Sequence, residues 1–173
     1  MKRTINAIVV AGIMLLAARP LAAQGNPRGT AKLSLNGKTV SVEYGRPSLK
    51  GRTVDALLGQ LKPGGAWRMG ADKSTTFMSE TDLSFGSVTV PAGTYSLWAR
   101  HEADGWKLVF NKQHDQWGTQ HDAAQDLAAA PLSQTKLSKS VEEVTISLGE
   151  SAGGGLFSLQ WGDLDLSAKF KAK

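Results

Sequence analysis

The sequence predicts an all-β fold, a mainly antiparallel β-sandwich or flattened barrel with one short helix in a long loop. Two observations support this prediction: runs in which apolar and polar residues alternate, and turn-forming residues between those runs. Alternation with a period of two places successive side chains on opposite faces of an extended chain, so each run has one apolar face. About eight short strands of this kind favour two layers packed around one core.

The first two predicted strands form a hairpin. Apolar residues alternate with polar residues over 31–35 and again over 40–44. Asn36-Gly37 separates the two runs, and both residues tolerate the positive φ that a type I′ turn requires. A second hairpin of this kind is predicted where Asp104-Gly105 separates the runs 94–101 and 106–110.

Between residues 45 and 65 the alternation stops. This stretch is rich in Gly and Pro and contains one short helical candidate, 54–61. Because Gly and Pro at this density are typical of turns, we predict a long structured loop that carries a small helix.

The other predicted strands follow the same pattern. They cover 75–79, 83–90 with a kink near Gly86, 144–148, 157–161 and 164–170. The polar and then alanine-rich stretch 113–130 is equally compatible with a loop, a short helix or an irregular strand. The sequence therefore leaves that stretch without an assignment.

The N-terminal residues predict an exported protein, periplasmic or extracellular. Met1-Lys2-Arg3 precedes an apolar run over 5–18, and small residues follow it up to Ala23. Basic, apolar and small segments in this order are typical of a secretory signal peptide. We expect a signal peptide over 1–23, and one domain over 24–173 with no membrane span. An uncleaved anchor is the alternative, although the run is shorter than the about 20 apolar residues of a membrane span.

The charge of the chain argues against a nucleic-acid partner. The sequence has 20 basic and 15 acidic residues. Removal of the signal peptide takes away Lys2, Arg3 and Arg19, which leaves 17 basic residues against 15 acidic ones. A chain so close to neutral attracts phosphate only weakly at long range. With no cysteine in the sequence, stability has to come from the core and not from disulfides.

Four segments, taken together, resemble one protein family. They are 42–52, which contains GRPSLKGR, then 67–77, then 91–97, which reads PAGTYSL, and finally 106–118. In this order they resemble the bacterial domain of unknown function 2911, over about residues 32–161. The resemblance implies an exported β protein without an assigned activity or cofactor. Met69 and Asp72-Lys73-Ser74 depart from the family pattern, in which Thr and an Asn-Glu-Ala-like run are expected.

Arginine and aromatic residues in the loops mark a candidate ligand site. Arg46 and Arg52 flank a loop that follows Tyr44, and Arg68 is next to Trp67. If these loops converge, guanidinium groups beside aromatic rings would bind a carboxylate, a phosphate or a sugar. The alternative is that Arg46 and Arg68 only bind loop carbonyls and pack on the neighbouring rings. The candidate ligand-binding residues are Tyr44, Arg46, Arg52, Trp67, Arg68, Lys112 and Trp117.

Trp98 is predicted to lie on the face of its strand opposite Leu97. Together with Trp117 it would form either a stacking platform for a carbohydrate or a lid on the end of the sandwich.

The only cluster with metal or acid–base character is His114-Asp115 followed by His121-Asp122. Imidazole and carboxylate groups suit Zn²⁺, but the spacing matches no established metal motif and lies in a polar loop. The alternative is a solvated loop without a metal. There is no cysteine nucleophile and no Gly-x-Ser-x-Gly sequence, so we name no catalytic residue and expect no cofactor.

These observations favour a non-enzymatic binding or interaction module, with a small anionic or saccharide ligand or an envelope partner. Two alternatives remain open at this point. One is a metal-dependent, hydrolase-like enzyme that uses the His114 and His121 loop, and the other is a purely structural envelope protein.

Overall fold

Ten strands, one short α-helix and one 3₁₀ turn make up residues 25–62 and 64–173, the part of the chain that the computed structural model describes. Every strand pair is antiparallel, which confirms the all-β prediction. The predicted signal peptide lies outside the described residues. The elements are β1 (Arg28–Leu35), β2 (Lys38–Gly45), α1 (Val54–Leu58), β3 (Ala66–Trp67), β4 (Thr75–Ser79), β5 (Leu83–Phe85), β6 (Val88–Val90), β7 (Gly93–Glu102), β8 (Gly105–Asn111), the 3₁₀ turn η1 (Ala123–Gln125), β9 (Asp126–Ser151) and β10 (Gly154–Ala172).

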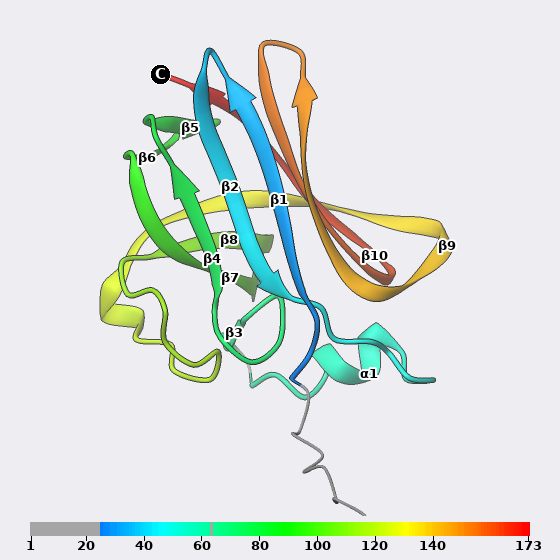
Figure 1. Ribbon diagram of the computed structural model, residues 1–173. Coiled ribbons are helices and arrows are strands. Elements are labelled where there is room, and N and C mark those ends of the chain that lie inside the picture. Colours follow the sequence, from blue (N-terminus) through cyan, green and yellow to red (C-terminus); the bar gives the residue numbers. More distant parts are fainter. Residues whose placement is uncertain (1–24, 63) are drawn as a thin grey trace, which may run out of the picture.

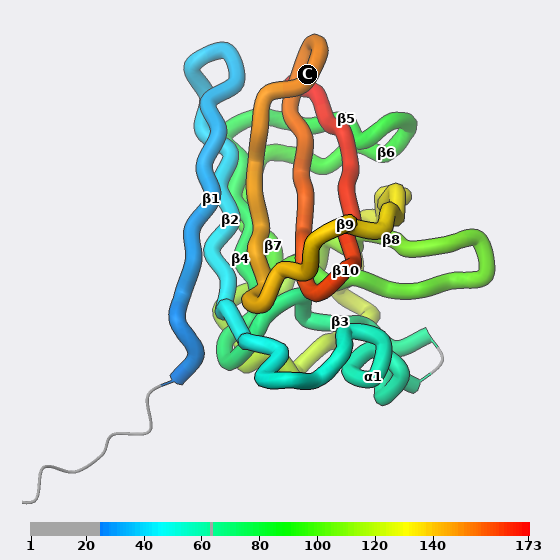
Figure 2. Tube along the Cα trace, turned by 90° about the vertical axis from the view of Figure 1, so that its right-hand side faces the viewer, coloured from blue at the N-terminus to red at the C-terminus, as the bar shows by residue number. Residues whose placement is uncertain are grey.

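The strands form one sheet in the order β1-β2-β4-β7-β8-β9-β10-β5-β6, with β3 beside β7. The sheet is not closed, but it curls until β1 contacts β9 and β10. Figures 1 and 2 show the β1–β2 hairpin lying alongside the long β9–β10 hairpin, with α1 and the loops at one end of the molecule. Within the described residues, no helix is both long and apolar enough to cross a membrane.

Both predicted hairpins are confirmed. In the first, Asn36 and Gly37 have φ angles of 51° and 77°, and Leu33 lies opposite Val40. In the second, residues 96–102 of β7 pair with residues 105–111 of β8. Gly105, in the turn between them, has a φ of 116°. The turn residues therefore fix the register that places the apolar side chains on one face.

Two local predictions need correction. The segment 83–90 is not one kinked strand but two, because Gly86 has a φ of 64° and turns the chain between β5 and β6. The helix begins at Val54, where the Thr53 side chain accepts a hydrogen bond from the Ala56 N–H, but it ends at Leu58 and not at residue 61. Gly59 follows it as the C-cap, a position that glycine commonly takes near helix ends.

The C-terminal region contains two long strands where the sequence predicts several short ones. β9 pairs with β8 over 126–132 and then with β10 over 133–151. Over 133–143 the side chains of β9 are exposed or only partly buried on both faces, so no apolar alternation marks this stretch as strand. In β10 the register shifts around Gly162, and this irregularity interrupts the alternation that would have joined 157–161 to 164–170.

The core lies on the concave side of the curled sheet. Aromatic side chains from strands that are distant in sequence meet there. The ring centroid of Phe110 lies 5.4 Å from that of Phe77 and 5.1 Å from that of Phe85. Phe85 in turn stacks on Phe170 at 5.2 Å. The predicted apolar faces of the strands therefore do form the interior.

The middle of β7 is buried on both faces. Trp98, on the face away from the main core, is only 1% exposed. Its indole N–H donates to the Ser96 hydroxyl at 2.8 Å, and that hydroxyl donates to the Gln113 carbonyl at 2.7 Å. The loop between β8 and β9 thus covers this face and holds Trp98 under it, so Trp98 does not form an exposed platform.

Candidate functional site

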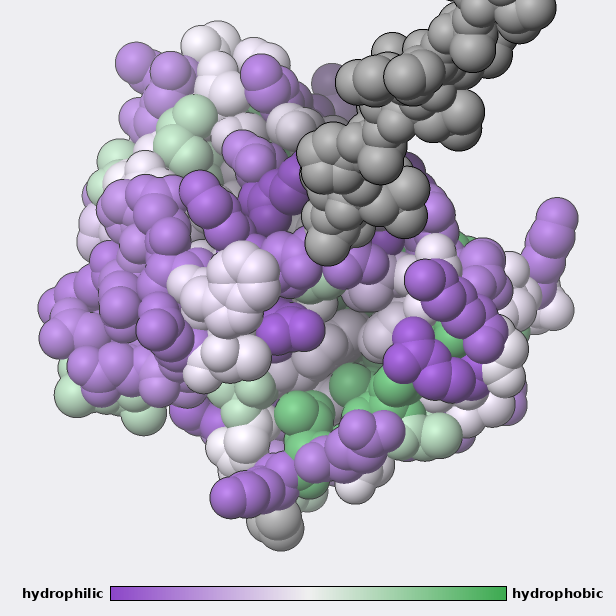
Figure 3. Space-filling view, turned by 60° about the horizontal axis from the view of Figure 1, so that its bottom comes forward, coloured by the Kyte–Doolittle hydropathy of each residue, from purple (hydrophilic) through white to green (hydrophobic). Residues whose placement is uncertain are grey.

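A pocket of about 600 Å³ opens at the end of the molecule where α1 and the loops gather. Figure 3 shows the hollow, with apolar side chains along one side of it and hydrophilic side chains around the rest. Its wall combines the loop before α1, the helix itself, the segment after β3, the loop after β8, and single side chains from β7 and β10. These segments are far apart in the sequence and meet only because the sheet curls.

The charged side chains in the wall are cations. Lys50, Arg52 and Arg68 line the pocket, and no aspartate or glutamate is among the lining residues. Within residues 25–62 and 64–173, none of these three side chains makes a salt bridge. The three cations therefore have no ion-pair partner among the described residues, although the carboxylates of Glu142 and Asp72 lie near the lining, where they accept from the backbone N–H groups of Lys50 and Asn26.

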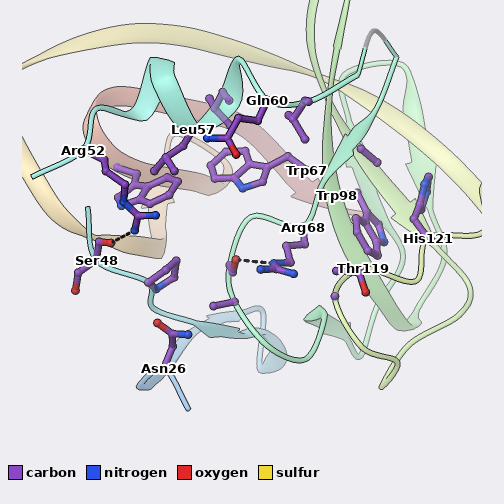
Figure 4. Close-up of a pocket in the computed structure, with 18 of the residues that line it drawn as sticks. Asn26, Ser48, Arg52, Leu57, Gln60, Trp67, Arg68, Trp98, Thr119 and His121 are labelled. Atoms are coloured by element: carbon purple, nitrogen blue, oxygen red, sulfur yellow. Dashed lines mark hydrogen bonds between the residues drawn. The ribbon is translucent and has the colours of Figure 1, made fainter. Parts of the chain in front are cut away.

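Both guanidinium groups are positioned by backbone carbonyls. Arg52 donates from Nε to the Leu49 carbonyl at 2.8 Å and from Nη2 to the Ser48 carbonyl at 3.1 Å. Arg68 donates from Nε to the Gly70 carbonyl at 3.1 Å. Figure 4 shows both side chains directed into the space between α1 and β7. These contacts leave one Nη group of Arg52 and both Nη groups of Arg68 without an acceptor in the described chain.

Gly118 makes room for the Arg68 side chain. A Cβ atom at position 118 would lie 2.6 Å from Cδ of Arg68 and 2.8 Å from the Asp72 carbonyl oxygen. Such distances are too short for real contacts, so only glycine permits this approach of the loop to the arginine stem.

The opposite side of the pocket is apolar. Leu57 and Leu58 of α1 are partly buried against the core and also line the pocket. Below them Trp67 and Trp161 stack, with ring centroids 5.9 Å apart and planes 14° apart. Trp67 is 8% and Trp161 is 5% exposed, so the two rings offer little free face.

The indole N–H of Trp161 is buried and has no hydrogen-bond partner in the described residues. Buried donors of this kind are rare, because an unmade hydrogen bond costs about 1–3 kcal/mol. The pocket wall therefore contains a polar group that residues 25–62 and 64–173 do not satisfy.

The structure brings together three of the seven residues predicted for ligand binding. Arg52, Trp67 and Arg68 line the pocket. Tyr44 lies in the core, where its hydroxyl donates to the Ile146 carbonyl at 3.2 Å. Arg46 makes a salt bridge to Glu143 at 3.0 Å, outside the pocket.

The other two predicted residues also lie away from the lining. Lys112 is exposed just after β8. Trp117 is 51% exposed, while its neighbours Gly118 and Thr119 line the pocket. Of the two arrangements considered for Trp98 and Trp117, the stacking platform is not formed, since one ring is buried under the loop and the other is open to solvent.

The two histidines of the metal alternative point to different partners. His114 pairs with Asp115 at 2.7 Å, and His121 pairs not with Asp122 but with Asp126, at 2.9 Å. Asp122 instead caps η1 by accepting from the Ala124 N–H. No group of three or more potential metal ligands is found in the described part of the chain. The geometry thus supplies no ligand set for the metal-dependent enzyme.

Several residues that line the pocket are absent from the predicted ligand site, among them Lys50, His121 and Trp161. The sequence places Trp161 on an apolar strand face and His121 in a loop that is either solvated or metal-binding. Trp98 also lines the pocket. No local sequence pattern predicts that these residues come together at the pocket, because their positions depend on pairing between strands that are distant in sequence.

Comparison with known proteins gives one match. No curated protein and no solved structure matches the chain. A family model described as "Protein of unknown function (DUF2911)" matches residues 26–170, a span that contains every residue lining the pocket. Because this match covers most of the chain, the protein belongs to the DUF2911 family.

Proposed function

We propose that this protein is an exported binding module for a small anionic ligand with an apolar body. The observation that carries the proposal is the charge of the pocket wall. Lys50, Arg52 and Arg68 line it without a carboxylate among the lining residues. Uncompensated cations in a concave site attract an anion and hold it more strongly than the same cations would on an open surface.

The free donors of the arginines match an oxygen anion. Both Nη groups of Arg68 and one of Arg52 make no hydrogen bond in the described chain. A guanidinium group presents parallel N–H groups that fit two oxygens of a carboxylate or a phosphate. Since backbone carbonyls already hold both side chains in place, little rotamer freedom is lost when the anion binds.

The apolar wall favours an apolar ligand body over a saccharide. Leu57 and Leu58 present aliphatic surface, and burial of such surface contributes about 25 cal/mol per Å². Sugar recognition would need an open aromatic face, whereas Trp67 and Trp161 are buried against each other. A ligand with an anionic group and an apolar body would contact both the cationic side and the apolar side of the pocket.

Calorimetric titration of the purified protein tests the proposal with four probes: octanoate, octanol, glucuronate and inorganic phosphate. We expect octanoate to bind, and octanol to bind at least about tenfold more weakly because it lacks the charge. The octanoate affinity should also fall as salt is added. Failure of octanoate to bind, or equal binding of octanol, would contradict the proposal. Tighter binding of glucuronate would instead support a saccharide site.

Single substitutions locate the binding site. Arg52→Gln and Arg68→Gln are each expected to weaken octanoate binding about tenfold, because a hydrogen bond to a charged group contributes about 1.5–3 kcal/mol. Arg28→Gln is the matched control, since Arg28 pairs with Glu43 at the sheet edge, outside the pocket lining. Circular dichroism would verify that each variant is folded. Equal affinities in all three variants would place the ligand elsewhere.

Export is tested separately, by N-terminal sequencing of the protein recovered outside the cytoplasm. The expected mature sequence begins at Gln24, after removal of the basic and apolar leader. A recovered chain that still begins with Met1 would show that the leader is retained.

A further inference from the structure

A second polar feature lies in the same pocket, on the other side from Arg52. His121 lines the pocket there, and its ring rests on Trp98 with centroids 4.7 Å apart. Figure 4 shows Arg52 and His121 at opposite ends, with Arg68 and Trp98 between them. The contribution of His121 to binding is therefore separate from that of the arginines.

One nitrogen of His121 is fixed by a network behind it. Nε2 lies 2.9 Å from Oδ1 of Asp126. That carboxylate also accepts from Nδ2 of the buried Asn111 at 2.7 Å and from Nη1 of Arg100 at 3.2 Å. Because the carboxylate can only accept, Nε2 carries the proton in this pair. In a neutral imidazole the other nitrogen, Nδ1, is then an acceptor.

That acceptor has no partner among the described residues. Nδ1 of His121 makes no hydrogen bond with any of residues 25–62 and 64–173, and it is not among their buried unsatisfied atoms. The His121 side chain retains 17% exposure. His121 is thus a lining residue whose Nδ1 is accessible and has no acceptor or donor partner among the described residues.

We infer that His121 accepts a hydrogen bond from a hydroxyl group of the ligand, so that the ligand of this pocket is a hydroxylated acid. The inference rests on the proposed function. The anionic group of the ligand binds at Arg52 and Arg68. Its hydroxyl group lies at the far end of the apolar body, because His121 is on the other side of Trp98 from the arginines. His121 is a specificity-determining residue, held in position by Asp126.

Titration with octanoate, 2-hydroxyoctanoate and 8-hydroxyoctanoate tests the inference. We expect 8-hydroxyoctanoate to bind roughly threefold to tenfold more tightly than octanoate, the gain that one neutral hydrogen bond provides. The 2-hydroxy isomer, whose hydroxyl group lies next to the carboxylate, should show no such gain. Equal binding of octanoate and 8-hydroxyoctanoate would overturn the inference and leave the proposed function intact. No binding of any of the three would overturn both.

His121→Phe removes the acceptor and keeps an aromatic ring on Trp98. In this variant the ratio of the 8-hydroxyoctanoate affinity to the octanoate affinity should fall to about one, whatever the absolute affinity for octanoate. A preference that survives the substitution would assign the hydroxyl group to another residue.

A measurement on the unsubstituted protein does not depend on the variant being folded. The ¹⁵N resonance of His121 Nδ1 is expected to move when 8-hydroxyoctanoate is added, because the nitrogen then accepts a hydrogen bond. Octanoate should leave it nearly unchanged. The same small change with both acids would contradict the hydrogen bond.

Discussion

Replacing Phe110 with alanine is expected to lower the free energy of unfolding by about 3–5 kcal/mol. The Phe110 side chain is fully buried. Its ring centroid lies within 5.4 Å of that of Phe77 on β4 and 5.1 Å of that of Phe85 on β5. These two strands lie toward opposite ends of the sheet order and do not pair with each other. The Phe110 ring therefore packs together two parts of the sheet that are not directly hydrogen-bonded. Alanine would leave a cavity that the surrounding side chains cannot fill, because they are held on different strands.

Urea unfolding followed by tryptophan fluorescence measures this loss. Trp117→Ala is the control, because it removes a larger ring from an exposed position and should change the free energy by less than about 0.5 kcal/mol. If the Phe110 and Trp117 variants unfold at the same urea concentration, the aromatic cluster is not what holds the curled sheet together.

Gly45→Ala is expected to destabilise the fold by about 3 kcal/mol or more, at the upper end of what overpacking costs. A Cβ atom at position 45 would lie 2.2 Å from the carbonyl oxygen of Ala71, 2.8 Å from its nitrogen and 2.9 Å from its carbonyl carbon. All three are backbone atoms, so no side chain can rotate away to relieve the clash. The loop that contains Ala71 has to move instead.

That loop also carries part of the pocket. Gly70 and Ala71 line it, and the Gly70 carbonyl accepts the hydrogen bond from Arg68. The Gly45 variant should therefore lose octanoate binding as well as thermal stability. Gly149→Ala is the matched control, because a Cβ there has no neighbour within 4 Å. Similar melting temperatures for the two variants would show that the close approach of residues 45 and 71 is dispensable.

Local sequence patterns were sufficient to predict the hairpins but not the long strands. Asn36-Gly37 and Asp104-Gly105 determine their turns through their own backbone preferences, so a few residues suffice. By contrast, β9 is extended over 133–136 because β10 pairs with it, although its side chains are exposed there. A strand that is stabilised by pairing with its neighbour, and not by burial of one face, shows no alternation of apolar and polar residues in the sequence.

The candidate site was predictable only in part, for the same physical reason. Arg52, Trp67 and Arg68 stood out because Gly- and Pro-rich loops that carry charge and aromatic rings often form binding sites. Trp161 reaches Trp67 only through the folding of the whole sheet. The position of His121 depends on Asp126 at the start of β9, a contact between residues that no sequence pattern links. Contacts of this kind cannot be predicted from the spacing of residues within a short segment of sequence.

The pairing of β5 with the end of β10 determines when the molecule can finish folding. Ser84 lies opposite Lys171, and Leu83 lies opposite Ala172. Until residues 171 and 172 have been synthesised, β5 therefore has only β6 as a paired strand. Pairings between such distant positions form slowly, in milliseconds to seconds. Such a delay would suit the export proposed above, because a chain that is still unfolded can be threaded through a membrane channel.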